Sequence, residues 1–291
     1  MDFLQMRTEI GAVAAGIGLG PDVCGAVAEC AQNVLNEETV RLCARLTEPE
    51  TARDAAQRIS ELFVQDPGGA AKLTLFLGAA CLAREKWAQI GVADEIFWDT
   101  AACLARFVQE MRQRTGRPLF DREQWAWRQM CGRLFRLGTL EFEYVVVEEG
   151  ACRPWGVQPG QAVLSVHIPG DRPLTEQSLR ESYRQAAAFW EKYEAAFCPV
   201  GRPVLWCCDS WLLSPMLAQC LPASSAIRTF ARAYELYDVD PADESFYFWL
   251  FGGKKKPEEL EQRTSLQRAV AEKLRRGEPI GSARGFLAFL K

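Results

Sequence analysis

The residue best suited to proton transfer is His167, the one histidine in the 291-residue sequence. It follows the largely apolar run 162–166 and precedes the turn signal Pro169-Gly170-Asp171, so its ring is placed where a strand is predicted to end. An imidazole titrates near neutral pH, and this position therefore favours a general base. The alternative is a structural histidine that donates to a backbone carbonyl and fixes the Pro-Gly turn.

Acidic side chains near this predicted strand form two further candidate groups. Asp171 is placed to orient His167 or to bind a cationic substrate, although Gly-Asp-Arg-Pro is also ordinary turn chemistry. Glu141 and Glu143 alternate along an earlier predicted strand and therefore share one of its faces. That pair is placed to collect a cationic amine, and the alternative is a solvated acidic face.

The segment 206–211, Trp-Cys-Cys-Asp-Ser-Trp, is the second candidate site. Cys208 and Ser210 share one side of the predicted strand and are candidate proton donors. Alternatively, Asp209 and Ser210 cap the turn into the next helix. Cys207 or Cys208 as a nucleophile beside His167 would instead indicate a Cys-His hydrolase or transferase.

The cysteine pattern gives no indication of a metal site or of disulfides. The eleven cysteines are odd in number, scattered, and without a Cys-x-x-Cys pair. Neighbouring Cys207 and Cys208 point to opposite faces of a strand, so they do not form a chelating pair. With one histidine, too few ligands remain for zinc, and we expect most thiols to be buried apolar groups.

Composition excludes several functional classes. The chain is 48% hydrophobic and 25% charged with a net charge of -4, which argues against a nucleic-acid partner. We find no secretory leader and no apolar run of roughly 20 residues. We therefore expect a cytoplasmic protein that does not bind membranes. The oligomeric state is left open.

The first part of the chain has helical periodicity throughout. Apolar residues recur at helical spacing in 21–36, 70–90 and 93–114, and Gly116-Arg117-Pro118 stops the last of these helices. The pattern predicts an all-helical domain over residues 1–118, with a boundary that can extend to about 150.

The remaining residues, 119–291, alternate between strand and helix patterns. Segment 134–147 predicts two strands or one bent strand around Gly138, and a strand at 162–168, a helix at 175–197 and a strand at 202–210 then form a βαβ crossover with parallel strands. We further expect a short helix at 215–221, an antiparallel strand pair at 227–237 and 245–251, and a closing helix at 265–276. The fold class is therefore α+β, with mixed α/β character in the second domain.

Three strings carry a resemblance to a known family: His167-Ile168-Pro169-Gly170-Asp171, Cys208-Asp209-Ser210-Trp211-Leu212-Leu213-Ser214-Pro215 and Arg263-Thr264-Ser265-Leu266-Gln267-Arg268. Together with the element order, they resemble a bacterial family of acyltransferase-domain proteins. Its members join a helical N-acyltransferase N-terminal domain to a GNAT-like C-terminal domain. The resemblance implies a mixed sheet with one central βαβ crossover.

The resemblance also implies acyl transfer from acetyl-CoA or another acyl-CoA to a small-molecule or peptide amine. His167 would then take the proton of the attacking amine, Ser210 or Cys208 would donate one to the leaving thiolate, and Trp206 would line the thioester. The candidate substrate-binding residues are Asp171, Glu141, Glu143 and Trp211.

One loop departs from the usual GNAT pattern. Such enzymes hold the CoA pyrophosphate with a glycine-rich loop between the central strand and its helix. Here that loop contains two prolines and Asp171, which leaves Ile168, Gly170 and Arg172 as the candidate cofactor contacts. The alternative function is a non-catalytic GNAT-like ligand-binding module with a degenerate cofactor loop.

Overall fold

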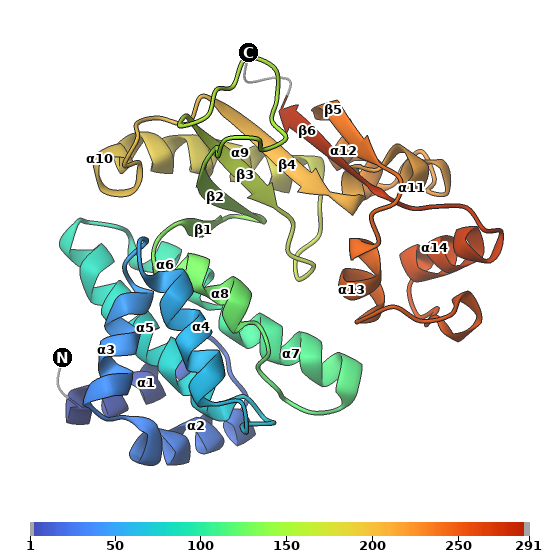
Figure 1. The fold of residues 1–291 in the computed structure, drawn as a ribbon. Helices are drawn as coiled ribbons and strands as arrows, with labels where there is room; N and C mark the ends of the chain where they lie inside the picture. The colour runs from blue at the N-terminus through green and yellow to red at the C-terminus, as the bar shows by residue number, and fades with distance from the viewer. Residues whose placement is uncertain (1–2, 288–291) are drawn as a thin grey trace. The chain divides into compact units, whose positions relative to one another are not determined.

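The computed structural model describes residues 3–287. The chain divides into two compact units, Met1–Leu137 and Gly138–Lys291, which we describe separately. The first unit is helical and ends in one short strand, while the second contains a mixed sheet with helices (Figure 1).

The first unit is built around one central helix. Helix α5 (Ala70–Gln89) contacts α1, α2, α3, α6 and α8, and the residues along its middle are buried on all sides. Its small side chains, among them Ala79, Ala80 and Ala83, allow close approach of those neighbours. The described elements of this unit are α1 (Phe3–Gly16), α2 (Pro21–Val34), α3 (Glu37–Leu46), α4 (Ala52–Leu62), α5, α6 (Asp94–Ala101), α7 (Cys103–Thr115), α8 (Glu123–Met130) and β1 (Leu134–Leu137).

One predicted helix of this unit is interrupted. Segment 93–114 forms two helices, α6 and α7, which meet at Ala102. No glycine or proline marks the break, so helical periodicity alone carries no signal for it. Thr100, near the end of α6, is fully buried and accepts a hydrogen bond from the backbone N–H of Arg136 in β1 at 3.0 Å.

The second unit is organised on a sheet whose described strands lie in the order β2-β3-β4-β6-β5. These strands are β2 (Leu140–Val146), β3 (Ala162–His167), β4 (Leu205–Ser210), β5 (Tyr234–Asp240) and β6 (Ser282–Leu287). Strands β3 and β4 are parallel and the other pairs are antiparallel. Helices α9 (Glu176–Lys192) and α10 (Glu194–Phe197) connect β3 to β4, which confirms the predicted crossover.

The strand registers define two sheet faces of different character. The helix face carries Phe142, Trp206 and Tyr234, and α9 covers it: the ring of Tyr183 in α9 lies 6.1 Å from Phe142 and 6.1 Å from Trp206. The opposite face, which we call the polar face, carries charged and other polar side chains and one thiol along successive strands, beside the apolar Val145, Val163, Leu205 and Phe286. By register the polar side chains and the thiol are those of Glu141, Glu143, Ser165, His167, Cys207, Asp209, Arg284 and Asp238.

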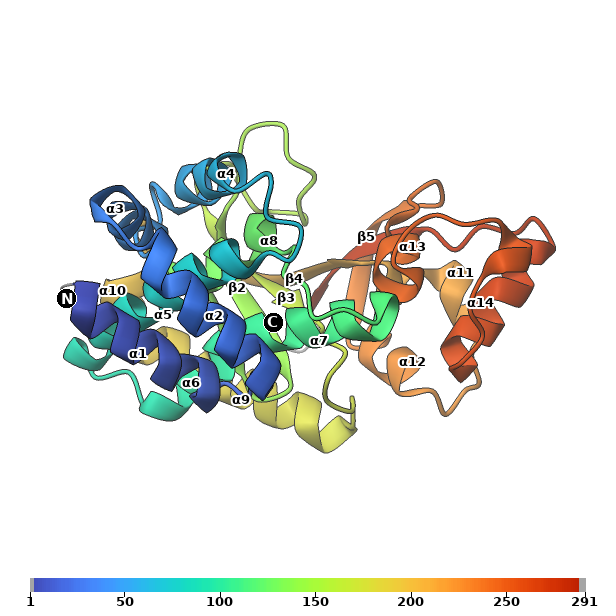
Figure 2. The same cartoon turned by 90° about the horizontal axis from the view of Figure 1, so that it is seen from below.

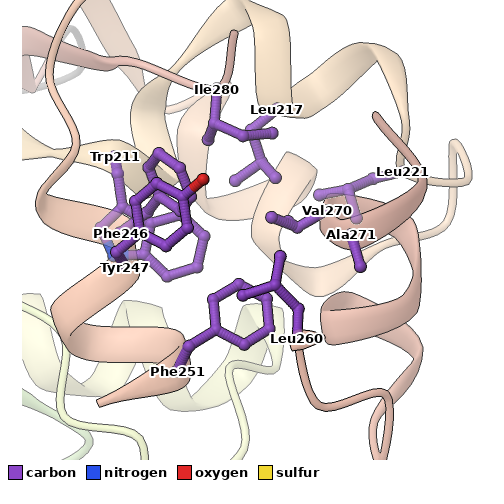
Figure 3. Close-up of a cluster of buried hydrophobic side chains, with 10 residues drawn as sticks. All are labelled: Trp211, Leu217, Leu221, Phe246, Tyr247, Phe251, Leu260, Val270, Ala271 and Ile280. Atoms are coloured by element: carbon purple, nitrogen blue, oxygen red, sulfur yellow. The ribbon is translucent and has the colours of Figure 1, made fainter. Parts of the chain in front are cut away.

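A separate cluster of short helices lies at one end of this sheet (Figure 2). It begins where β4 ends, ends where β6 begins, and consists of η1 (Trp211–Leu213), α11 (Pro215–Gln219), α13 (Ser245–Phe251), η2 (Pro257–Glu259) and α14 (Ser265–Arg275). We call it the helical cap. Its own core contains ten buried residues that point toward one another: Trp211, Leu217, Leu221, Phe246, Tyr247, Phe251, Leu260, Val270, Ala271 and Ile280 (Figure 3).

The predicted strand pair at 227–237 and 245–251 is wrong. Residues 226–231 form helix α12 (Ala226–Ala231) before β5 starts, and 245–251 is helix α13. A short apolar run without polar alternation does not distinguish a strand from a buried helix, and here Phe246, Tyr247 and Phe251 fill the cap core.

The true antiparallel partner of β5 is β6, which the sequence pattern did not indicate. Gly281, Arg284 and Gly285 interrupt its apolar alternation. Gly285 is required by close packing, because a Cβ there would lie 2.9 Å from the Cβ of Tyr234. The closing helix at 265–276 is confirmed as α14.

The turn between β1 and β2 gives a testable consequence of this packing. Gly138 has a φ of 73°, and a Cβ built on it would lie 2.6 Å from the Oγ of Ser182 in α9. That hydroxyl accepts hydrogen bonds from the backbone N–H groups of Thr139 at 2.6 Å and Leu140 at 3.1 Å. We expect Gly138→Ala to lower the free energy of unfolding by roughly 2–4 kcal/mol, measured by urea denaturation.

Gly150→Ala is the matched control, because Gly150 has a φ of 75° and no atom within 4 Å of its ideal Cβ. It should lose only the backbone contribution, about 1 kcal/mol. Equal losses for the two variants would show that the contact with Ser182 contributes nothing.

Candidate functional site

The parallel strands β3 and β4 part at their carboxyl ends. Their ladder pairs Val163 with Leu205, Leu164 with Trp206 and Ser165 with Cys207. Beyond this third pair β3 continues to His167 and β4 continues to Ser210, while residues 207–210 of β4 pair with β6 on its other side. The ladder between the two strands therefore ends before the strands themselves do, and we call the region between their carboxyl ends the splay. Openings at the carboxyl ends of parallel strands are where α/β sheets bind ligands.

His167 is the last residue of β3 at this splay, and Glu143 of β2 holds its ring. The distance from His167 Nε2 to Glu143 Oε2 is 3.0 Å, and the two side chains are 21% and 8% exposed. An ionised carboxylate only accepts hydrogen bonds, so Nε2 carries a proton, and in the neutral form of the ring the lone pair is therefore on Nδ1. The pair thus fixes both the orientation and the tautomer of the imidazole.

The two glutamates of β2 do not form a solvated acidic face. Glu141 is 2% and Glu143 6% exposed, which overturns that alternative. Glu141 is the register partner of His167, and Glu143 is the register partner of Ser165. Both carboxylates therefore lie on the polar face beside the splay, and buried acids of this kind are more typical of functional sites than of a solvated strand.

A second charged group on the polar face was missed by the sequence reasoning. Arg284, in the middle of β6, donates from Nε to Asp209 Oδ2 at 2.8 Å and from Nη1 to Asp238 Oδ2 at 2.5 Å. Hydrogen bonding to Asp209 is the main cause that raises the pKa of the arginine above its ordinary value. Asp209 is the register partner of Arg284, and a bulge between Leu236 and Asp238 aligns Asp238 with Arg284 from the other side.

Cys208 and Ser210 lie on the other side of the sheet from His167. Both alternate with Trp206 along β4 and belong to the helix face. Cys208 is 1% exposed, and burial raises the pKa of its thiol well above the ordinary value. The Oγ of Ser210 accepts a hydrogen bond from the backbone N–H of Leu212 at 3.1 Å, so it caps η1. The strand's period of two thus separates this pair from the imidazole.

The two candidate tryptophans have mainly packing contacts. Trp206 lies 5.5 Å from the ring of Phe142 and packs on the helix face near the splay. Trp211 is 8% exposed and is part of the core of the helical cap, where it is drawn in Figure 3.

The loop after β3 leads into α9 without a glycine-rich cradle. Gly170, Asp171 and Arg172 are exposed, and Ile168 is half-buried. Arg172 donates from Nη1 to the backbone carbonyl of Gly138 at 2.9 Å. The side chain of Thr175 accepts the backbone N–H of Ser178 in a capping box, so one donor of the α9 N-terminus is already used.

Family models match both units of the chain. A model described as GNAT-like C-terminal domain matches residues 134–287, more than half of the 291 residues, and one described as N-acyltransferase N-terminal domain matches residues 8–132. The chain belongs to the family of proteins with a GNAT-like C-terminal domain. A comparison with curated proteins gave no match.

Solved structures show the same fold as this GNAT-like protein. An acyltransferase in complex with decanoyl-CoA and teicoplanin is 22% identical with a TM-score of 0.68, and the match covers 96% of this chain and 99% of that one. An acyltransferase in complex with CoA and 10C-teicoplanin is 23% identical with a TM-score of 0.67, over the same shares of the two chains. Within residues 3–287 of the GNAT-like protein, no helix is long and apolar enough to cross a membrane.

All eleven cysteines of the GNAT-like protein lie within the described residues, and none of them forms a disulfide. Cys207 lies on the polar face, but burial raises its pKa to about 12. At pH 8 such a thiol is roughly one ten-thousandth ionised, which disfavours both a Cys207 and a Cys208 nucleophile.

Thiol labelling tests this assignment. In a limited reaction with iodoacetamide at pH 8, the exposed Cys152 should be alkylated first and Cys207 and Cys208 at least a hundredfold more slowly, because thiolate is the reactive form. Peptide mass spectrometry gives the order of labelling. If Cys207 or Cys208 were labelled as early as Cys152, the hypothesis of a cysteine nucleophile would be restored.

Proposed function

We propose that this protein is an acyl-CoA-dependent N-acyltransferase that transfers an acyl group directly to an amine. The observation that carries the proposal is the imidazole of His167, oriented by Glu143, at the splay of a GNAT-like domain. The acyltransferase complexes with decanoyl-CoA and with CoA, which share this fold, support an acyl-CoA as the donor substrate. A module without catalysis has no evident use for a half-buried imidazole whose tautomer is fixed.

The proposed reaction assigns one role to each side of the splay. The thioester of the acyl-CoA lies between the diverging ends of β3 and β4, where the ladder no longer uses the facing backbone groups. Backbone N–H groups are suited to stabilise the oxyanion that forms when the amine attacks. Nδ1 of His167 takes a proton from the amine, and Glu143 stabilises the resulting imidazolium.

The remaining site residues are assigned by charge and position. Arg172, with Ile168 and Gly170 in the loop after β3, is the proposed neighbour of the CoA phosphates, because its guanidinium is the cation of that loop. Trp206 forms the proposed apolar wall for the acyl chain. Glu141 and Asp171 are proposed to attract a cationic acceptor, which we infer to be a small-molecule or peptide amine.

Donor binding and transfer give a direct test. Saturating decanoyl-CoA should raise the melting temperature, since a ligand at a hundred times its dissociation constant adds about 2.7 kcal/mol, whereas free decanoate should not. With decanoyl-CoA as donor and spermidine, glucosamine, glycylglycine or teicoplanin as acceptor, mass spectrometry should detect an acylated amine. Absence of both binding and transfer would contradict the proposal.

Substitution of the base separates catalysis from binding. His167→Asn should lower kcat by roughly 10²–10⁴ while the thermal shift with decanoyl-CoA is retained, because the ring serves proton transfer rather than donor binding. Glu143→Gln should lower kcat as well, with little change in KM, because an amide no longer imposes the tautomer. A His167→Asn variant with the wild-type kcat would remove His167 from the mechanism.

A further inference from the structure

We propose that Asp209 docks the ammonium group of the acceptor, directly across the splay from His167. This inference rests on the proposed function, in which Glu141 and Asp171 attract the acceptor but no residue is assigned to hold its ammonium group beside the base. The β3–β4 ladder ends with the pair Ser165 and Cys207. His167 and Asp209 each lie two residues beyond that pair, so both side chains point to the polar face.

The register places these two side chains on facing walls of one opening. Neighbouring strands lie about 4.8 Å apart while they are paired, and the separation grows where they diverge. Asp209 and His167 therefore face each other across a gap. Where the ladder ends, the width of this gap is close to the spacing of paired strands. An amine between them is in contact with both a carboxylate and a base.

Asp209 is an exposed acid whose side chain is held in one orientation. It is 55% exposed, yet its Oδ2 accepts from Arg284 Nε at 2.8 Å, and Arg284 is itself held by Asp238. The bulge in β5 brings Asp238 into register with Arg284, and bulges are enriched beside active sites, where they re-aim side chains. A preoriented carboxylate loses less freedom on binding a cation than a mobile one does.

The charges on the polar face favour binding of the cationic acceptor over binding of the anionic phosphates of the donor. Arg284 is shared by two carboxylates, so this triad carries a net charge of about -1. Glu141 and Glu143 of β2 also lie on this face, where Glu143 contacts His167 and both glutamates have further partners, so the attraction is attributed to the triad alone. An amine arrives as a cation at neutral pH and is attracted, whereas the phosphates of CoA are repelled.

The proposed transfer conserves atoms, electrons and charge. The ammonium bound to Asp209 gives one proton to Nδ1 of His167, and the resulting amine forms a C–N bond at the thioester carbonyl. The C–S bond then breaks, the thiolate of CoA leaves with the electron pair, and the second nitrogen proton passes to that sulfur. His167 returns its proton to solvent, so the products are an amide, CoA thiol and one proton.

The kinetic test compares two neutralising substitutions. Asp209→Asn should raise the KM for the best amine among spermidine, glucosamine and glycylglycine about tenfold, with the KM for decanoyl-CoA unchanged, because the charge that attracts the ammonium is lost while an amide oxygen can still accept from Arg284. Asp209→Glu should recover most of the loss. Glu235→Gln is the matched control: it removes the same charge from an exposed residue of β5 on the same face and should leave both KM values unchanged.

Calorimetric measurement of the binding of the same three amines distinguishes the docking inference from the proposed function. If wild-type protein transfers no acyl group but binds an amine, and Asp209→Asn weakens that binding about tenfold, the docking site stands and the proposed function fails. If transfer occurs and Asp209→Asn leaves the acceptor KM unchanged, or raises only the donor KM, the docking inference is overturned. Wild-type protein that binds none of the three amines also overturns it.

Discussion

The second unit depends on one constraint: the ladder between β3 and β4 ends after three pairs, while β4 stays paired with β6 to its last residue. Residues 207–210 of β4 are fully engaged with β6, so the end of β4 stays extended after the β3–β4 ladder stops. Pairing with β6 uses only one edge of β4, so the backbone groups of the edge that faces β3 remain for a ligand beyond the end of the β3–β4 ladder. The antiparallel β6 therefore holds the end of β4 extended, and Gly285 in β6 allows the close approach of β5 that completes the sheet.

On each side of the splay, a hydrogen bond from a neighbouring strand orients one side chain of the proposed reaction. On the β3 side, Glu143 sets the orientation and tautomer of His167. On the β4 side, Arg284 sets the orientation of Asp209 and is itself anchored by Asp238. In both cases a neighbouring strand supplies the positioning group, so the geometry is set by strand pairing and not by a mobile loop. This arrangement is suited to bringing a base and a cation site to one carbonyl.

The sequence predicted the parts of this arrangement that depend on local patterns. The crossover followed from apolar runs, a capped amphipathic helix and turn residues, and His167 followed from its place at a strand end. The contact with Glu143 needed the β2–β3 register, in which Glu143 lies opposite Ser165 rather than His167, and no local pattern fixes that register. Similarly, β6 lies 72 residues after β4 in the chain, and its interrupted apolar pattern concealed both the strand and the role of Arg284. The run 245–251 was misassigned because its aromatic side chains fill a local helical core instead of a sheet.

Strand parity decides which candidate residues act together. Cys208 and Ser210 are neighbours of Asp209 in sequence, but the period of two turns them to the helix face, where Cys208 is buried and Ser210 caps η1. Asp209 and His167 are far apart in sequence, but the in-register parallel pairing turns them to the same face. The net negative charge of the Asp209–Arg284–Asp238 group favours an amine over phosphates on this face, which agrees with the proposed place of the CoA phosphates beside Arg172. Charge thus separates the two substrates of the proposed reaction before either meets the base.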